Sequence, residues 1–520
     1  MSQLRAVTLI CSLCVSTALF AAEAKVHTKS GTLVGTTEGD LRIFKGVPFA
    51  KPPVGSLRWK EPQPVEKWTG VREATRFAPR CMQRPLFSDM MFRSNGISED
   101  CLYLNVWTPA KSAKAKLPVL VYFFGGGFRA GDGSEYRYDG ANMAEEGIVT
   151  VTVNYRLDVF GMLAHPELTK ESPHHASGNY TLLDQSAALH WVHDNIAAFG
   201  GDPKRITIAG ESAGSASVSA QMVSPLSRDL IAGGIGESGS IFGTETSLQE
   251  AEQDGAKYAS MIGANSIEAL RAMPADQLLK AAANDSLPRL RMIVDGYFFP
   301  KPPQELYEAG DEAHVPLLAG TNSAESDAGA ILGQQPMTVS NYREALQRLY
   351  GNRAEEVFAL YPARTDADVE NAARELASDR FLGLNTWEWV DAHARTSGKP
   401  TFYYYYAHPR PVTRANPNAP KPTGAVHSAE IEYVMGNLRT NPVFAWTDDD
   451  RTVSQLMMAY FANFIRTGNP NGKGLAQWDA YNSNDSHPRM TIDVEPKLQP
   501  DSRRTRYQAM QRDGMETEED

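Results

Sequence analysis

The stretch ITIAGESAG at residues 206–214 decides the fold. Its first four residues have the β-branched and apolar character of a buried strand, and small residues suited to a close-packed helix follow from Ala213. Between them lies a Gly-x-Ser-x-Gly motif centred on Ser212. This order indicates a nucleophile elbow, a sharp turn that needs glycine on both sides and exposes the serine hydroxyl above the sheet. The alternative is a glycine-rich turn with a purely structural role.

Buried strands alternate with helices around this motif. Five segments carry the pattern: apolar runs at 117–124, 148–153, 315–319 and 401–406, and helical spacing at 184–198. Such alternation predicts a large, mostly parallel central sheet with helices on both faces. No internal repeat is present, so a solenoid is excluded.

Three later segments complete the predicted organisation. Residues 335–397 are expected to be mostly helical and to cover the site as a cap. Residues 409–422 contain five prolines and predict a surface loop. The charged segment from Asp501 is expected to fray. We therefore predict one catalytic domain over residues 25–510 and a disordered acidic tail over residues 511–520.

A serine hydroxyl is a weak nucleophile and needs a base to take its proton. His427 is the best candidate, because it follows the last predicted core strand, far downstream of Ser212. Other histidines lie in a polar loop or on a predicted helix and have weaker claims. A carboxylate should follow a strand between the two, where it would orient the imidazole. Glu325 and Asp327 both occupy such a place.

Acyl transfer also requires donors for the developing oxyanion. The triplet Gly125-Gly126-Gly127 follows the predicted strand 117–124. We expect the backbone N–H groups of Gly126, Gly127 and Ala213 to supply them. The triplet is neither a P-loop nor a dinucleotide fingerprint, because no Lys-Ser/Thr follows it and no Gly-x-Gly-x-x-Gly opens a helix.

The composition argues against two classes of binding partner, nucleic acids and metal ions. A net charge of −11 without clustered Lys and Arg argues against nucleic acid, and no ligand spacing suggests a metal. Residues 1–24 predict a signal peptide: Arg5 precedes an apolar run, and Ala22-Glu23-Ala24 resembles a cleavage site. A membrane anchor is the alternative, but the run is short and interrupted by hydroxyl residues. We therefore expect a secreted or periplasmic protein without a stable membrane span.

The cysteines support export. Cys11 and Cys14 would leave with the signal peptide, which keeps the pair Cys81 and Cys101. An even pair suits one disulfide in an oxidising compartment, and two buried free thiols are the alternative.

Together these residues resemble the type-B carboxylesterase family. The resemblance runs over about residues 25–481 and rests on six stretches: FGGDPKRITIAGESAG at 199–214, EDCLYLNVWTP at 99–109, NYRL at 154–157, GNY at 178–180, EIEY at 430–433 and GNPN at 468–471. It implies the α/β-hydrolase fold, a Ser-Glu-His triad with Glu325 as the acid, and a disulfide between Cys81 and Cys101. Glu211 and Ser238 occupy positions that support the triad in relatives.

The chain departs from the family before the glycine triplet and after the acid, where Ser326-Asp327-Ala328 differs from the usual glycine. Phe124 stands where the family has histidine, and it is a candidate substrate contact. Arg129 stands two residues beyond the triplet. We hypothesise that Arg129 binds a carboxylate on the acyl group, the alternative being a solvated surface arginine.

The sequence thus predicts a serine carboxylesterase that hydrolyses a small-molecule ester through an acyl-enzyme without a cofactor. The same triad could act on amides, carbamates or lactones. A non-catalytic binding relative is a further alternative, but such proteins often lose the serine or the histidine, and both are present here. The sequence leaves the oligomeric state open.

Overall fold

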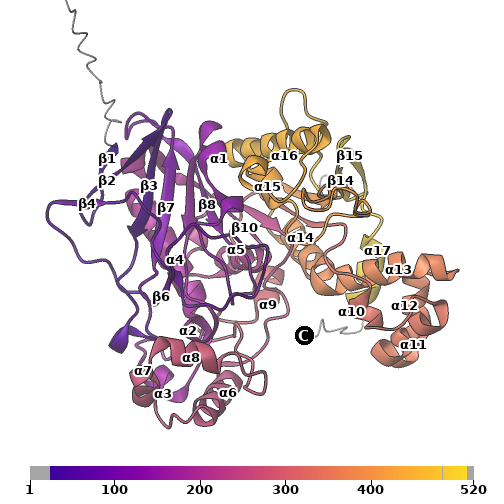
Figure 1. The fold of residues 1–520 in the computed structure, drawn as a ribbon, viewed down its shortest axis with the longest axis horizontal. Helices are drawn as coiled ribbons and strands as arrows, with labels where there is room; N and C mark the ends of the chain where they lie inside the picture. Colours follow the sequence, from indigo (N-terminus) through magenta and orange to yellow (C-terminus); the bar gives the residue numbers. More distant parts are fainter. Residues whose placement is uncertain (1–23, 483, 512–520) are drawn as a thin grey trace, which may run out of the picture.

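A mixed sheet of 13 strands runs through the molecule, in the computed structural model that describes residues 24–482 and 484–511 (Figure 1). Its strands lie in this order: β1 (Ala24–His27), β2 (Thr32–Glu38), β3 (Leu41–Pro48), β7 (Tyr103–Thr108), β9 (Val149–Val153), β8 (Leu117–Phe123), β10 (Gly201–Glu211), β11 (Gly233–Glu237), β12 (Leu317–Asn322), β13 (Thr401–Tyr406), β14 (Pro488–Ile492) and β15 (Lys497–Pro500), with β4 (Val71–Glu73) paired to β2. A separate ribbon joins β5 (Arg80–Cys81) and β6 (Ile97–Ser98).

The centre of the sheet is parallel, as predicted. Every neighbouring pair from β9 to β14 is parallel, and antiparallel strands flank this centre on both sides. All of β9 and nearly all of β8 are buried, as a sheet covered on both faces requires. Parallel strands bring their carboxyl ends to one edge, and the residues that follow β8, β10 and β12 meet there.

Helices connect and cover these strands. They are α1 (Ala141–Glu145), α2 (Asp158–Met162), α3 (Pro166–Glu171), α4 (Tyr180–Asn195), α5 (Ala213–Val223), α6 (Leu248–Met261), α7 (Ile267–Ala272), α8 (Ala275–Ala281), α9 (Pro303–Glu308), α10 (Gly329–Leu332), α11 (Val339–Tyr350), α12 (Ala354–Leu360), α13 (Asp366–Ser378), α14 (Leu384–Thr396), α15 (Ile431–Val434), α16 (Asp448–Thr467) and α17 (Arg504–Gln511). A π-helical turn, Asp379–Gly383, joins α13 to α14.

The glycines of β11 show that both faces are covered. Successive strand residues point to opposite faces. A Cβ at Gly233 would approach Phe464 of α16, whereas one at Gly234 would meet Met222 of α5. Helix α16 therefore packs on one face of the sheet and α5 on the other.

The predicted helical interval 335–397 is confirmed as α11 to α14. Its parts lie at different depths. Helix α14 packs against the sheet, since Trp389 would meet a Cβ at Gly236, while α11 and α12 lie to one side, away from α5 and β10 (Figure 1). The predicted loop at 409–422 has almost no regular structure, but Arg410 is buried and pairs with Glu432 at 2.7 Å.

The prediction that the chain frays from Asp501 is wrong. Asp501 is buried, and α17 follows it with Tyr507 and Met510 in the core. Polar groups of this segment bind inside the protein. The Arg506 guanidinium and the Tyr507 hydroxyl both contact the buried Asp379, each at 2.7 Å. The predicted acidic tail lies outside the described residues except for Gln511, which ends α17.

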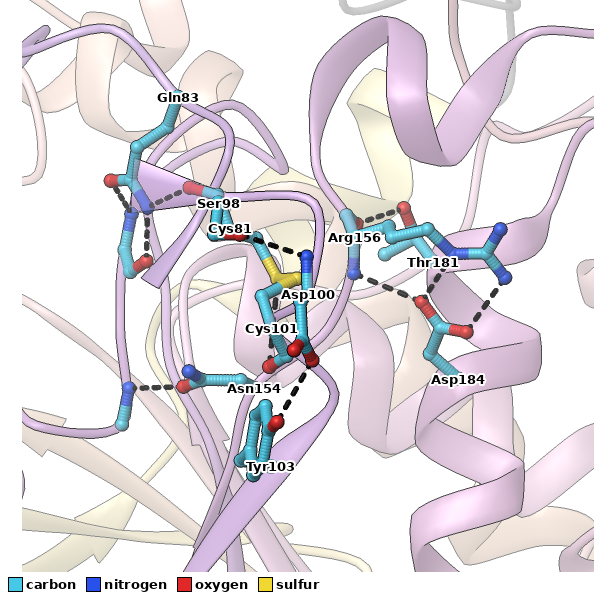
Figure 2. Close-up of a disulfide and its surroundings, with 12 residues drawn as sticks. Cys81, Gln83, Ser98, Asp100, Cys101, Tyr103, Asn154, Arg156, Thr181 and Asp184 are labelled. Atoms are coloured by element: carbon cyan, nitrogen blue, oxygen red, sulfur yellow. Dashed lines mark hydrogen bonds and ion pairs between the residues drawn. A yellow bond between two sulfur atoms is a disulfide. The ribbon is translucent and has the colours of Figure 1, made fainter. Parts of the chain in front are cut away.

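The predicted disulfide between Cys81 and Cys101 is present (Figure 2). Two hydrogen bonds hold the chain around Cys101: the Tyr103 hydroxyl donates to Asp100, and the Asp100 N–H donates to the Ser98 hydroxyl. The predicted signal peptide lies outside the described residues apart from Ala24, the first residue of β1. Within residues 24–482 and 484–511, no helix has the length and apolar character needed to cross a bilayer.

Candidate active site

Ser212 lies on a tight turn between β10 and α5. Its backbone has φ 57° and ψ −122°, outside the conformations that L-residues favour, and its N–H donates to Glu237 O at 2.8 Å. A Cβ at Gly210 would lie 2.4 Å from Gly214 O, and one at Gly214 would lie 2.0 Å from Phe123 O. Only glycine therefore fits at either position, which is the local reason that the motif forms an elbow.

His427 lies between Ser212 and Glu325. Its Nε2 is 3.0 Å from Ser212 Oγ, and its Nδ1 is 2.7 Å from Glu325 Oε2. Because a carboxylate only accepts, the proton of the neutral ring belongs on Nδ1. Nε2 is then free to accept from the serine hydroxyl.

Two hydrogen bonds to backbone oxygens join the loop after β12 to the histidine loop. Ala324 N donates to Ala425 O at 2.8 Å, and the Asn322 amide donates to Val426 O at 2.9 Å. The Glu325 carboxylate is fixed by two further donors at 2.5 Å, the Ser238 hydroxyl and the Asn322 N–H. The acid and the histidine thus reach one position although about a hundred residues separate them.

Buried carboxyl groups set the electrostatics of the imidazole. Glu211 Oε1 lies 3.2 Å from His427 Nε2. Burial alone would lower the pKa of His427, but the carboxyl groups of Glu211 and Glu325 raise it to about 9. Burial raises the pKa of Glu211, while the charge of His427 lowers it. The surroundings of the ring therefore favour imidazolium, the form that a base acquires when it takes the serine proton.

The glycine loop passes directly beside Ser212. A Cβ at Gly125 would lie 3.1 Å from Ser212 Cβ. Gly126 and Gly127 have φ values of 112° and 60°, which suit glycine. The N–H groups of Gly126, Gly127 and Ala213 donate to no acceptor within the described ranges, so all three can serve a bound oxygen.

Comparisons with known proteins agree with this geometry. A match to the family described as "Carboxylesterase family" covers residues 22–511. This chain belongs to the carboxylesterase family.

Relatives of this carboxylesterase are similar over most of their length. The chain is 36% identical to the fumonisin B1 esterase of Sphingopyxis macrogoltabida, over 88% of the chain and 84% of that protein. It is 35% identical to liver carboxylesterase 1 of Oryctolagus cuniculus, over 85% and 84%. Two solved structures, a PNB esterase and the carboxylesterase Est55 of Geobacillus stearothermophilus, superpose with TM-scores of 0.76 and 0.80. They share 32% and 31% identity, and each match covers 93% of this chain and 99% of the other. This carboxylesterase is a carboxylic ester hydrolase with the α/β-hydrolase fold.

Three other predicted residues of the carboxylesterase lie around this cluster. The Phe124 ring is 1% exposed and stacks on Tyr155 with centroids 4.1 Å apart. The ring also packs against Gly131, since a Cβ there would lie 2.2 Å from Phe124 Cδ2. The expected contact of this ring with substrate is therefore wrong, because the ring is buried inside the protein. Arg129 is exposed at the end of the loop. Asp327, the alternative acid, is exposed and accepts from Gly329 N at 2.7 Å.

Sequence reasoning missed two neighbours of the triad residues. Phe381, on the π-helical turn after α13, packs edge-on against His427 with ring centroids 5.4 Å apart. Through it the helical interval reaches the site. Asn322 supports both loops, and its place at the end of β12 was the available signal. Across the part of the chain that the structure describes, no group of three or more His, Cys, Asp or Glu side chains could hold a metal ion.

Proposed function

We propose that this carboxylesterase cleaves esters by nucleophilic catalysis with Ser212, His427 and Glu325. The supporting observation is the continuous chain of contacts from Ser212 Oγ to His427 Nε2 at 3.0 Å and from His427 Nδ1 to Glu325 Oε2 at 2.7 Å. Nucleophile and base are within hydrogen-bond reach, and a third group orients the base.

In the first step Ser212 Oγ attacks the ester carbonyl carbon while His427 Nε2 takes the hydroxyl proton. The carbonyl oxygen becomes an oxyanion, which the N–H groups of Gly126, Gly127 and Ala213 stabilise. Collapse breaks the bond to the alcohol oxygen, and His427 returns the proton to that oxygen. The products are a free alcohol and an acyl group on Ser212.

In the second step water repeats the sequence on the acyl-enzyme. His427 takes a proton from water as the water oxygen attacks the acyl carbon. The bond between that carbon and Ser212 Oγ then breaks, His427 returns the proton to Oγ, and the carboxylic acid leaves. Glu325 remains ionised and stabilises the imidazolium in both steps. All groups are supplied by the chain itself, and no cofactor takes part.

We further propose that residues 25–510 form one catalytic domain that is secreted or periplasmic after removal of residues 1–24. A single sheet that begins with β1 and includes β15 supports the first statement. The Cys81–Cys101 disulfide supports the second, because disulfides persist in oxidising compartments.

The test is a panel of matched p-nitrophenyl esters and p-nitroanilides with Ser212→Ala as the blank. We expect the wild type to cleave the esters with a burst of p-nitrophenol equal to the enzyme concentration, and the variant to give neither burst nor turnover. Preferential anilide cleavage would favour an amidase, and full activity of Ser212→Ala would overturn the proposal.

A further inference from the structure

Arg129 projects from the loop that carries the proposed oxyanion donors. Its backbone N–H donates to Gly126 O at 3.0 Å, which fixes the residue two positions after Gly127. The side chain is exposed, and within the described ranges its guanidinium forms neither a hydrogen bond nor an ion pair. A cation with free donors therefore follows the proposed oxyanion donors by two residues.

Arg84 approaches the same loop from the disulfide segment. The neighbouring Gln83, shown beside the disulfide in Figure 2, donates to Gly131 O at 2.8 Å and accepts from Gly131 N at 2.9 Å. A Cβ at Gly131 would in turn lie 2.6 Å from Gly125 O, so the two segments are in contact. The Nε and Nη2 atoms of Arg84 are buried and have no acceptor among the described residues.

Buried donors without acceptors are costly, and each one needs an explanation. A further one lies nearby: the buried hydroxyl of Tyr258 in α6 has no partner within residues 24–482 and 484–511, and its electrostatic neighbours are Asp158 and Arg84. If Arg84 were an ordinary solvated surface arginine, its Nε and Nη2 atoms would be exposed to water rather than buried. Together they form a set of donors that awaits an acceptor.

The carboxyl group of Asp158 lies close enough to both arginines to interact with their charges. Burial raises its pKa, while the charges of Arg129 and Arg84 lower it. Asp158 has a φ of 51°, a left-handed conformation that Asp tolerates better than most residues, and its N–H donates to Phe128 O at 2.8 Å. Two guanidinium charges and one carboxylate charge give these three groups an excess of one positive charge.

We propose that Arg84 and Arg129 bind a carboxylate that the substrate carries away from its scissile ester bond. The inference rests on the proposed function and names a substrate class for that site. Guanidinium groups bind carboxylates by charge-assisted, often bidentate hydrogen bonds. One uncompensated positive charge matches a carboxylate better than a phosphate dianion.

The test compares pairs of esters that differ only in charge. Monoethyl glutarate and ethyl 4-carbamoylbutanoate place the carboxylate or its neutral amide on the acyl side. The anion of 3-acetoxypropanoic acid and its amide place the same groups on the alcohol side. We expect wild type to prefer the anion in one pair by about 10- to 100-fold in kcat/KM, as one charge-assisted hydrogen bond allows. The pair in which the anion is preferred shows whether the carboxylate is bound on the acyl side or on the alcohol side of the ester.

Variants assign that preference to its residues. Arg129→Gln and Arg84→Gln should each remove most of it, with a much smaller loss on the neutral amide ester. Asp158→Asn should strengthen it, because the competing carboxylate is gone, and Asn tolerates the same backbone conformation. Arg76→Gln, which removes the same charge from an exposed arginine after β4, serves as the matched control and should keep the preference.

Two results would overturn the inference: no charge preference in either pair, or equal losses on both esters in the arginine variants. If Arg84→Gln does not fold, Arg129→Glu at an exposed position still decides, because it should reverse the preference. An enzyme that hydrolyses the neutral esters without any charge preference refutes only this inference. An enzyme that hydrolyses none of the four refutes the proposed function.

Discussion

Replacing Glu325 by Gln removes one negative charge from behind the imidazole and keeps a side chain of the same shape. At the 2.7 Å between Glu325 Oε2 and His427 Nδ1, two unit charges attract by about 6 kcal/mol with an effective dielectric constant of about 20. The attraction exists only when the ring is charged, as in the transition state. Since about 1.4 kcal/mol corresponds to tenfold in rate, we expect kcat to fall about 10⁴-fold.

The assay is steady-state hydrolysis of a p-nitrophenyl ester, with circular dichroism to confirm that the variant is folded. Asp327→Asn is the matched control, because this exposed carboxylate follows the same strand and only accepts from Gly329 N. It should retain activity to within a few-fold. A Glu325→Gln enzyme within tenfold of wild type, or an equal loss in Asp327→Asn, would refute the assignment of the acid.

Three further perturbations test other parts of the structure. Glu211→Gln removes a charge that raises the pKa of His427, so the acid limb of the pH profile of kcat/KM should move to lower pH; an unmoved limb would contradict the electrostatic account. Cys81→Ser removes a disulfide with a sequence separation of 20 and should lower the free energy of unfolding by about 3 kcal/mol. The urea midpoint should fall accordingly, and the reduced wild type should show the same fall. Ending the chain after Asp501 leaves the buried Asp379 without its arginine partners and should cost about 3–5 kcal/mol of stability, whereas an unchanged midpoint would show that α17 is dispensable.

The elbow and the buried central strands could be predicted because local chemistry specifies them. Two glycines with no room for a Cβ bracket Ser212, and continuous apolar runs mark strands buried on both faces. His427 could be predicted because it follows Ser212 and the last predicted core strand along the chain. The acid was harder, since Glu325 and Asp327 follow the same strand, and only the fold directs the first inward and the second to solvent.

Other features depend on contacts between distant segments. Phe381 reaches His427 from a π-helical turn that its local sequence does not signal. The charged residues near the C-terminus predicted a segment exposed to solvent, but Arg506 forms an ion pair with the buried Asp379. Phe124 stands in the place of a family residue, yet its ring is buried against Tyr155 rather than exposed to substrate. Residue type alone does not reveal which partner a folded chain will supply.

The most direct test of the central claim is the site and rate of labelling by an organophosphate such as diisopropyl fluorophosphate. Peptide mass spectrometry should find one adduct, on Ser212, in the wild-type enzyme. In His427→Gln the labelling rate should fall by several orders of magnitude, because the hydroxyl 3.0 Å from Nε2 loses its base. An adduct on another residue, or labelling of the His427 variant at the wild-type rate, would contradict the account.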